Sequence, residues 1–115
     1  MPEQGPWLSI VIPAYNEAER LPPSLRTIIA YLREQDYSWE IVVVDDGSSD
    51  GTAGAAEEIL SGAGPYQILR NDPNRGKAMS VRRGLMESNG EVALFSDADL
   101  STPIEEAGPM LERIR

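Results

Sequence analysis

The sequence of 115 residues contains neither cysteine nor histidine. Without cysteine the protein has no disulfide and no thiolate metal site, a composition that is compatible with a reducing compartment. Without histidine it lacks the commonest general base and the commonest zinc ligand. Any acid–base or metal chemistry in this sequence therefore has to use carboxylates.

Positive charge is also scarce, because 10 lysines and arginines face 19 aspartates and glutamates, which gives a net charge of −9. Nucleic acid is not an expected partner, since such polyanions bind basic surfaces. An anionic ligand would need a bound cation or a local basic group to offset this negative field. No apolar run approaches the ~20 residues of a membrane-spanning helix.

What the sequence does contain is a regular alternation of apolar runs and helical patterns. We expect strands at 7–13, 40–44, 66–69 and 91–95, and helices at 22–35, 53–60, 77–89 and from 103 onwards. This order predicts parallel strands with right-handed crossovers and helices on both faces of the sheet. The fold class is therefore α/β, a single Rossmann-like domain of three α/β/α layers with a mostly parallel sheet.

Two of these helices carry more detailed expectations. The inward-facing residues predicted for the third helix are Ala78, Val81, Leu85 and Met86. Gly90 is expected to end that helix as its C′ residue. Residues 102–105 match a capping box with Pro103 at the first position of the last helix. The last helix reaches Arg115 without a stop signal, so we expect the sequence to be part of a longer protein.

Polar loops follow all four predicted strands. In an open α/β sheet, ligands bind outside the carboxyl ends of the strands. The side chains expected to meet there are Tyr15, Asn16 and Glu17, then Asp45 and Asp46, then residues 70–77, and finally Asp97 and Asp99. The sequence thus predicts a binding site at one edge of the sheet.

Asp97 and Asp99 stand one residue apart where the fourth strand ends. Two such carboxylates can share a hard divalent cation, which takes oxygen ligands. The alternative is a polar turn, because aspartate is common in turns. Their position beside three other polar loops favours the metal, and we expect the pair to bind a metal-bound diphosphate.

The other candidates also have structural alternatives. Tyr15 can stack on the edge of the sheet, Glu17 can be an ordinary residue of a helical first turn, and Asp45 or Asp46 can be a cap or turn residue. Arg75 and Lys77 are either solvated charges or part of an anion site at a helix N-terminus. Neither a Walker A loop nor a Gly-x-Gly-x-x-Gly fingerprint is present, which argues against a dinucleotide cofactor.

Four motifs together carry a family resemblance. They are Ser9–Glu17 (SIVIPAYNE), Val43–Thr52 (VVDDGSSDGT), Asn74–Ala78 (NRGKA) and Asp97–Pro103 (DADLSTP). In this order they resemble family 2 glycosyltransferases of the GT-A fold, and the last has the form seen in dolichyl- or polyprenyl-phosphate hexose synthases. The resemblance implies a sheet of order 3-2-1-4 and inverting transfer of a hexose from a UDP- or GDP-sugar, with Mg²⁺ or Mn²⁺. The implied acceptor is a polyprenyl or dolichyl phosphate.

The resemblance also assigns site residues. Those implied to bind the nucleotide-sugar are Pro13, Ala14, Tyr15, Glu17, Asp45, Asp46, Arg75, Lys77, Asp97 and Ala98. Within this set Asp46 would contact the base, and Arg75 and Lys77 would lie near the phosphates or sugar. Asp97 would approach the ribose or the metal, and Asp99 would hold the metal at the diphosphate. Ser101 stands where polyprenol-type members often carry glutamine, which leaves a third metal ligand open.

Domains of this family run to about twice this length, so residues 1–115 are expected to be the N-terminal nucleotide-sugar-binding part, with the catalytic base beyond Arg115. Alone, such a part is expected to bind the donor weakly and to transfer little sugar. The alternatives are a non-catalytic nucleotide-binding module or a nucleotidyltransferase, although residues 13–16 lack the Gly-rich basic stretch of the latter. We also expect an exposed fourth-strand edge that favours a homodimer, and a cytoplasmic location, at the membrane face in a longer protein.

Overall fold

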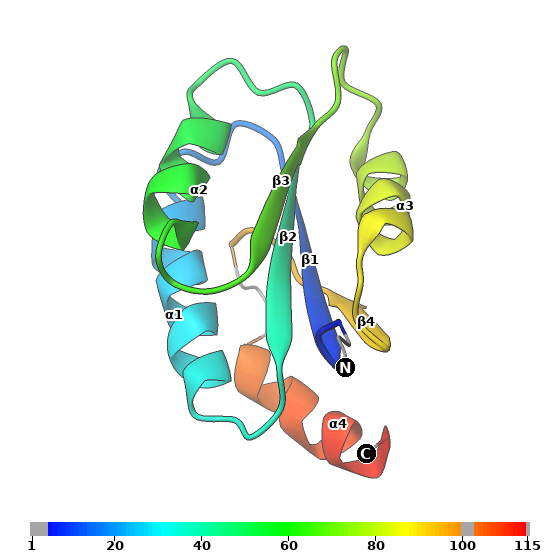
Figure 1. Ribbon diagram of the computed structural model, residues 1–115. Helices are drawn as coiled ribbons and strands as arrows, with labels where there is room; N and C mark the ends of the chain where they lie inside the picture. The colour runs from blue at the N-terminus through cyan, green and yellow to red at the C-terminus, as the bar shows by residue number, and fades with distance from the viewer. Residues whose placement is uncertain (1–4, 100–102, 115) are drawn as a thin grey trace.

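The computed structural model describes residues 5–99 and 103–114. Its elements are β1 (Leu8–Ala14), α1 (Leu21–Arg33), β2 (Trp39–Asp45), α2 (Thr52–Leu60), β3 (Tyr66–Arg70), α3 (Lys77–Glu87), β4 (Val92–Phe95), the 3₁₀ helix η1 (Ile104–Ala107) and α4 (Gly108–Ile114). The four strands are parallel and lie in the order β3-β2-β1-β4. Helices α1 and α2 cover one face of the sheet and α3 covers the other (Figure 1). The predicted fold class and strand order are confirmed.

The register of the sheet places the strand ends together. Ala14 at the end of β1 is opposite Asp45 at the end of β2, and Asp45 is opposite Arg70 at the end of β3. Strand β4 ends earlier, because Phe95 is opposite Val11. The backbone N–H of Ser96 then donates to the Val11 carbonyl at 2.9 Å, so the chain after β4 continues beside the last part of β1.

The larger apolar core lies between the sheet and α1. The helix buries Leu25, Ile28, Ile29 and Leu32, whose i, i+3, i+4, i+7 spacing makes one apolar stripe. Strand β1 is buried along its whole length, as expected for a strand covered on both faces. Ile104 of η1 and Leu111 of α4 join the same cluster.

The face that α3 turns toward the sheet differs from the prediction. Ala78, Leu85 and Met86 are exposed and Val81 is half-buried, whereas the buried residues are Ser80 and Gly84. The reason is close packing: a Cβ added at Gly84 would lie 2.3 Å from Val11 Cγ1 and 3.0 Å from Val44 Cγ2. Only very small residues fit where α3 meets the sheet, so its larger apolar side chains face outward.

Two predicted helix boundaries are also wrong. Helix α3 ends at Glu87, and Gly90 instead lies against β1, where an added Cβ would be 2.6 Å from Ser9 Oγ. The last helix does not start as an α-helix at Pro103, because a 3₁₀ turn precedes α4. Pro109 has no N–H to continue an earlier α-helix, but it is tolerated in the first turn of α4. Thr102 of the predicted capping box and Ser101 lie outside the described residues.

Candidate functional site

A cavity of about 310 Å³ opens at the carboxyl edge of the sheet. It is lined by Pro13, Ala14, Tyr15, Glu17, Asp46, Lys77, Ser80, Asp97, Ala98 and Asp99. These residues come from the ends of β1 and β2, from the first turn of α3 and from the segment after β4. The sheet register brings them together, because the segment after β4 runs beside the end of β1. Of the residues that the family resemblance assigns to the site, Asp45 and Arg75 do not line this cavity. Asn16 and most of the loop 70–77, also expected at this edge, lie outside its lining.

Asp46 is 5% exposed and binds the loop that leads into α3. Its Oδ1 accepts hydrogen bonds from the Asn71 side-chain amide at 2.9 Å and from the backbone N–H of Arg75 at 2.7 Å. Its Oδ2 accepts from the backbone N–H of Gly76 at 2.9 Å. Backbone amides at a helix N-terminus are a natural anion site. Here the amides of Arg75 and Gly76 already hold the protein's own carboxylate.

These hydrogen bonds also set the ionisation of Asp46. Burial by itself raises the pKa of its carboxyl group, because it disfavours the charged form. The hydrogen bonds from Arg75, Asn71, Gly76 and Ser80 act in the opposite direction and together outweigh burial. The resulting pKa lies below the usual 3.8. Asp46 is therefore a carboxylate at neutral pH.

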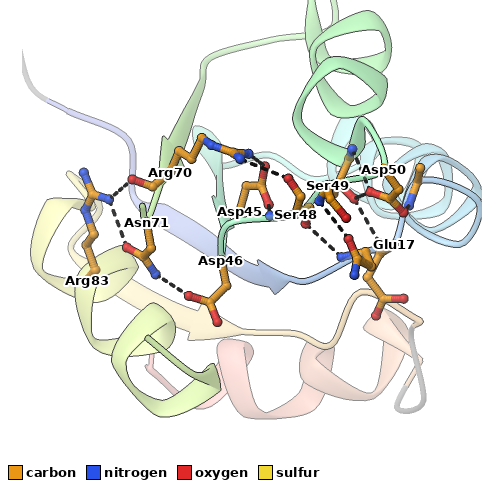
Figure 2. A network of polar contacts seen from close by, with 12 residues as sticks. Glu17, Asp45, Asp46, Ser48, Ser49, Asp50, Arg70, Asn71 and Arg83 are labelled. Atoms are coloured by element: carbon orange, nitrogen blue, oxygen red, sulfur yellow. Dashed lines mark hydrogen bonds and ion pairs between the residues drawn. The ribbon is translucent and has the colours of Figure 1, made fainter. Parts of the chain in front are cut away.

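Asp45 points away from Asp46, as successive residues of a strand do (Figure 2). It is fully buried, and its Oδ2 lies 2.6 Å from Arg70 Nη1. Its Oδ1 accepts from the backbone N–H of Ser48 at 3.0 Å. Arg70 also donates to the Ser48 carbonyl, so Asp45 fastens the loop after β2 to the end of β3. A role of Asp45 in donor binding stays a prediction.

The loop after β1 is held by the loop after β2. Asn16 adopts a left-handed conformation with φ of 53°, which asparagine tolerates better than most residues. Its backbone N–H donates to Ser48 Oγ at 2.8 Å, and its Oδ1 accepts from the Ser49 N–H at 3.0 Å. Tyr15 and Glu17 on either side of it are thereby fixed at the cavity, where Tyr15 is 52% exposed.

Glu17 has its own anchor. Its backbone N–H donates to Thr52 Oγ1 at 2.9 Å, which ties it to the start of α2. Its carboxylate forms an ion pair with the exposed Arg20 side chain, three residues further along the chain. A ligand approaching Glu17 would therefore meet a carboxylate that already has an exposed cationic partner.

Lys77 and Asp97 meet across the cavity. Lys77 is the first residue of α3, and its Nζ lies 2.5 Å from Asp97 Oδ1. The same ammonium group lies 5.6 Å from the centre of the Phe95 ring, within the range of a cation–π contact. Lys77 thus forms an ion pair with one of the two carboxylates that are predicted to bind a metal.

The donor set is chemically suited to a hard divalent metal, because Asp97 and Asp99 line the same cavity and offer carboxylate oxygens. Among residues 5–99 and 103–114, no group of three or more His, Cys, Asp or Glu side chains is placed to hold a metal ion. Two carboxylates, completed by water and by ligand phosphates, match the way Mg²⁺ is usually bound.

The sequence did not single out the residues that support Asp46, although Asn71 lies in the loop 70–77 that was expected at the site. The side-chain amide of Asn71 also donates to Ser80 Oγ at 2.9 Å. Arg83 Nη1 donates to Asn71 Oδ1 at 3.1 Å (Figure 2). Asn71 and Ser80 are both buried. The available signal was the pair of small residues Ser80 and Gly84, four apart on α3, which marks a face in close contact.

Comparison with known proteins identifies the family. Residues 9–115 match the family model described as glycosyl transferase family 2. The chain belongs to glycosyl transferase family 2.

Relatives within this family act on lipid phosphates, according to their names. A dolichyl-phosphate beta-glucosyltransferase of Trichomonas vaginalis is 35% identical over 114 residues, which cover 95% of this chain and 34% of that protein. An undecaprenyl-phosphate 4-deoxy-4-formamido-L-arabinose transferase of Pseudomonas fluorescens is 37% identical over 108 residues, covering 92% and 31%. The chain thus spans about a third of the length of these family 2 relatives.

A similar solved structure shares the fold. The mannosyltransferase of Pyrobaculum calidifontis, solved in complex with GDP-Man and Mn²⁺, superposes with a TM-score of 0.71 at 32% sequence identity. The match covers 85% of this chain and 29% of the mannosyltransferase. The GT-A-like sheet predicted from the sequence agrees with this similarity.

Proposed function

We propose that this chain binds the nucleotide-diphospho-sugar donor of an inverting hexosyltransferase. The observation that supports this best is the convergence of Asp97, Asp99 and Lys77 with Tyr15 in one cavity at the carboxyl edge of the sheet. An aromatic ring, a carboxylate pair and a cation together match a nucleoside, a metal and a diphosphate. The solved mannosyltransferase carries GDP-Man and Mn²⁺, which favours a nucleoside diphosphate sugar over other donors.

The residues divide into roles in this proposal. Tyr15 offers a surface for the base or ribose, and Asp46 borders the same pocket. Asp97 and Asp99 are the residues that hold Mg²⁺ or Mn²⁺. When bound, such a metal neutralises charge on the diphosphate leaving group. Lys77 is placed to donate to the phosphates, because it lines the cavity beside Asp97.

The acceptor in this proposal is a polyprenyl-type phosphate, because the family 2 relatives are named for dolichyl and undecaprenyl phosphate. Within the described residues, no helix is both long enough and apolar enough to cross a membrane. We assign no catalytic base among the cavity residues, since the acidic pair is better used on metal. About two thirds of the length of the relatives has no counterpart in this chain. In this proposal the base and the acceptor site lie in a region that corresponds to those two thirds.

Calorimetry with UDP, GDP and their sugar conjugates, each with and without Mn²⁺, tests the donor site. We expect binding that depends on Mn²⁺ and falls at least about tenfold in Asp99→Ala, because the loss of a charged ligand to the metal costs more than about 1.4 kcal/mol. Adding dolichyl phosphate to the same mixtures should release little or no nucleoside diphosphate.

The matched control is Glu58→Ala, which removes one exposed carboxylate from α2, far from the cavity. It should bind the donor like the original protein. Absence of metal-dependent binding for every nucleotide would contradict the donor-site proposal. Equal binding by Asp99→Ala would contradict the metal assignment alone, and sugar transfer by this chain would show that it contains its own base.

A further inference from the structure

Lys77 has an anchored backbone and an exposed head group. The preceding residues Arg75 and Gly76 are both hydrogen-bonded to the buried Asp46, which anchors the start of α3. The Lys77 side chain itself is 60% exposed, and that of Asp97 is 35% exposed. The ammonium group is therefore held at the cavity by a weak contact on a flexible stem, not by a buried ion pair.

Two cations compete for the same carboxylate. Asp97 Oδ1 lies 2.5 Å from Lys77 Nζ, and Asp97 is also one of the two metal ligands in the proposed function. A divalent metal on Asp97 and an ammonium group in that position would repel each other strongly at such a separation. Lys77 therefore has to leave Asp97 when a metal arrives, and the Phe95 ring that it also contacts cannot compensate fully.

A diphosphate changes this balance. It brings negative charge into the cavity that Lys77 lines, so the ammonium group can exchange Asp97 for a phosphate oxygen. The lysine stem allows this without movement of the anchored backbone. The presence of Lys77 thus opposes binding of the free metal but favours binding of the metal together with a diphosphate.

We propose that Lys77 makes the cavity selective for a metal–nucleotide complex over the free divalent cation. This inference rests on the proposed donor site and adds the residue that couples its two ligands. Donor and metal then bind together, and the free cation alone binds weakly. Lys77 acts as a specificity-determining residue. Its ammonium group takes the place of the metal beside Asp97 while the cavity holds no ligand.

The test measures two affinities in Lys77→Met. Free Mn²⁺ is followed by electron paramagnetic resonance during a titration with Mn²⁺ alone, and UDP and GDP are then titrated in the presence of Mn²⁺. We expect Mn²⁺ alone to bind about twofold to fivefold more tightly, which is the range of an exposed ion pair. Metal-dependent nucleotide binding should weaken about tenfold, because a charge-assisted hydrogen bond is lost.

Two variants distinguish the specific effect of the Lys77 ammonium group on Mn²⁺ binding from a general effect of net charge. Arg82→Met removes one positive charge from an exposed position of α3 outside the cavity and should change neither affinity by more than about twofold. Lys77→Arg keeps the charge and should keep Mn²⁺ alone weakly bound. The inference is overturned if Lys77→Met binds Mn²⁺ alone no more tightly than the original protein, or if Arg82→Met tightens it equally. If the original protein shows no Mn²⁺-dependent nucleotide binding, the proposed function fails as well.

Discussion

The two faces of the sheet are built differently (Figure 1). On the face covered by α1 and α2, one apolar cluster takes residues from β1, β2, both helices, η1 and α4. On the α3 face, the buried apolar cluster consists of Val11, Val42 and Val44, with Leu69 packed against it. Most of the apolar area that stabilises the described domain therefore lies on the first face.

The α3 face relies on buried polar contacts instead. At the amino end of the strands, Glu40 is buried, and its Oε2 accepts from Ser9 Oγ at 2.7 Å and from the Asn89 N–H at 2.6 Å. At the carboxyl end, Asp46 and Asn71 form the second network. Hydrogen bonds are directional, whereas apolar burial is not. The first face therefore provides most of the apolar burial, whereas polar contacts on the α3 face hold the loop that leads into α3.

The largest expected effect is on the first face. Leu25→Ala in α1 removes a side chain with no exposed surface, and we expect the free energy of unfolding to fall by about 2–5 kcal/mol. The matched change on the other helix is Met86→Ala, whose side chain in α3 is 71% exposed. This change should stay within about 0.5 kcal/mol. Urea denaturation followed by circular dichroism measures both, and similar losses would contradict the asymmetry of the two faces.

A smaller loss is expected where α3 meets the sheet. In Gly84→Ala the new Cβ has to displace Val11 and Val44, and such overpacking costs about 1–3 kcal/mol. Gly54 is the control, because it is also helical but has no atom within 4 Å of an added Cβ. Gly54→Ala should raise the free energy of unfolding by about 0.5–1 kcal/mol. If both alanines stabilised the protein in the same urea titration, α3 would not be closely packed.

The same difference between the faces explains what the sequence could predict. The apolar stripe of α1 is readable because burial there follows hydrophobicity. On α3 burial follows the distance between backbones, so Ser80 and Gly84 are inside while Leu85 and Met86 are outside. The pattern of apolar residues in the sequence does not predict the distance between the backbones of α3 and the sheet.

The candidate site shows the same limit. Parallel strands bring their carboxyl ends to one edge, which is why Asp46, Asp97 and Lys77 were predicted to converge. Alternation along a strand also requires Asp45 and Asp46 to face opposite ways. Which of them lines the cavity depends on the partners that Asn71 and Arg70 provide from β3 and the loop after it. Those long-range hydrogen bonds leave no local signal in the sequence.

The smallest effect concerns the polar network at the cavity. Asp46→Asn keeps one acceptor oxygen but turns an amide group toward the backbone N–H of Gly76 or Arg75. We expect it to lower the free energy of unfolding by about 1 kcal/mol at pH 7, the usual net value of one hydrogen bond. The control is Asp72→Asn, because Asp72 is an exposed aspartate of the loop between β3 and α3. This change should alter the free energy of unfolding by less than about 0.5 kcal/mol.

The effect of Asp46 should also depend on pH. Because the folded protein lowers the pKa of Asp46 below 3.8, the unfolded chain binds this proton more readily. The stabilisation is therefore complete above that value and is lost as the pH falls through the lower pKa of the folded state. Urea titrations at pH 7 and near pH 3 measure the free energy of unfolding of the original protein and of Asp46→Asn. The difference between the two free energies should be smaller at the lower pH. A difference that stays constant or widens would mean that Asp46 holds the α3 loop through its shape and not through its charge.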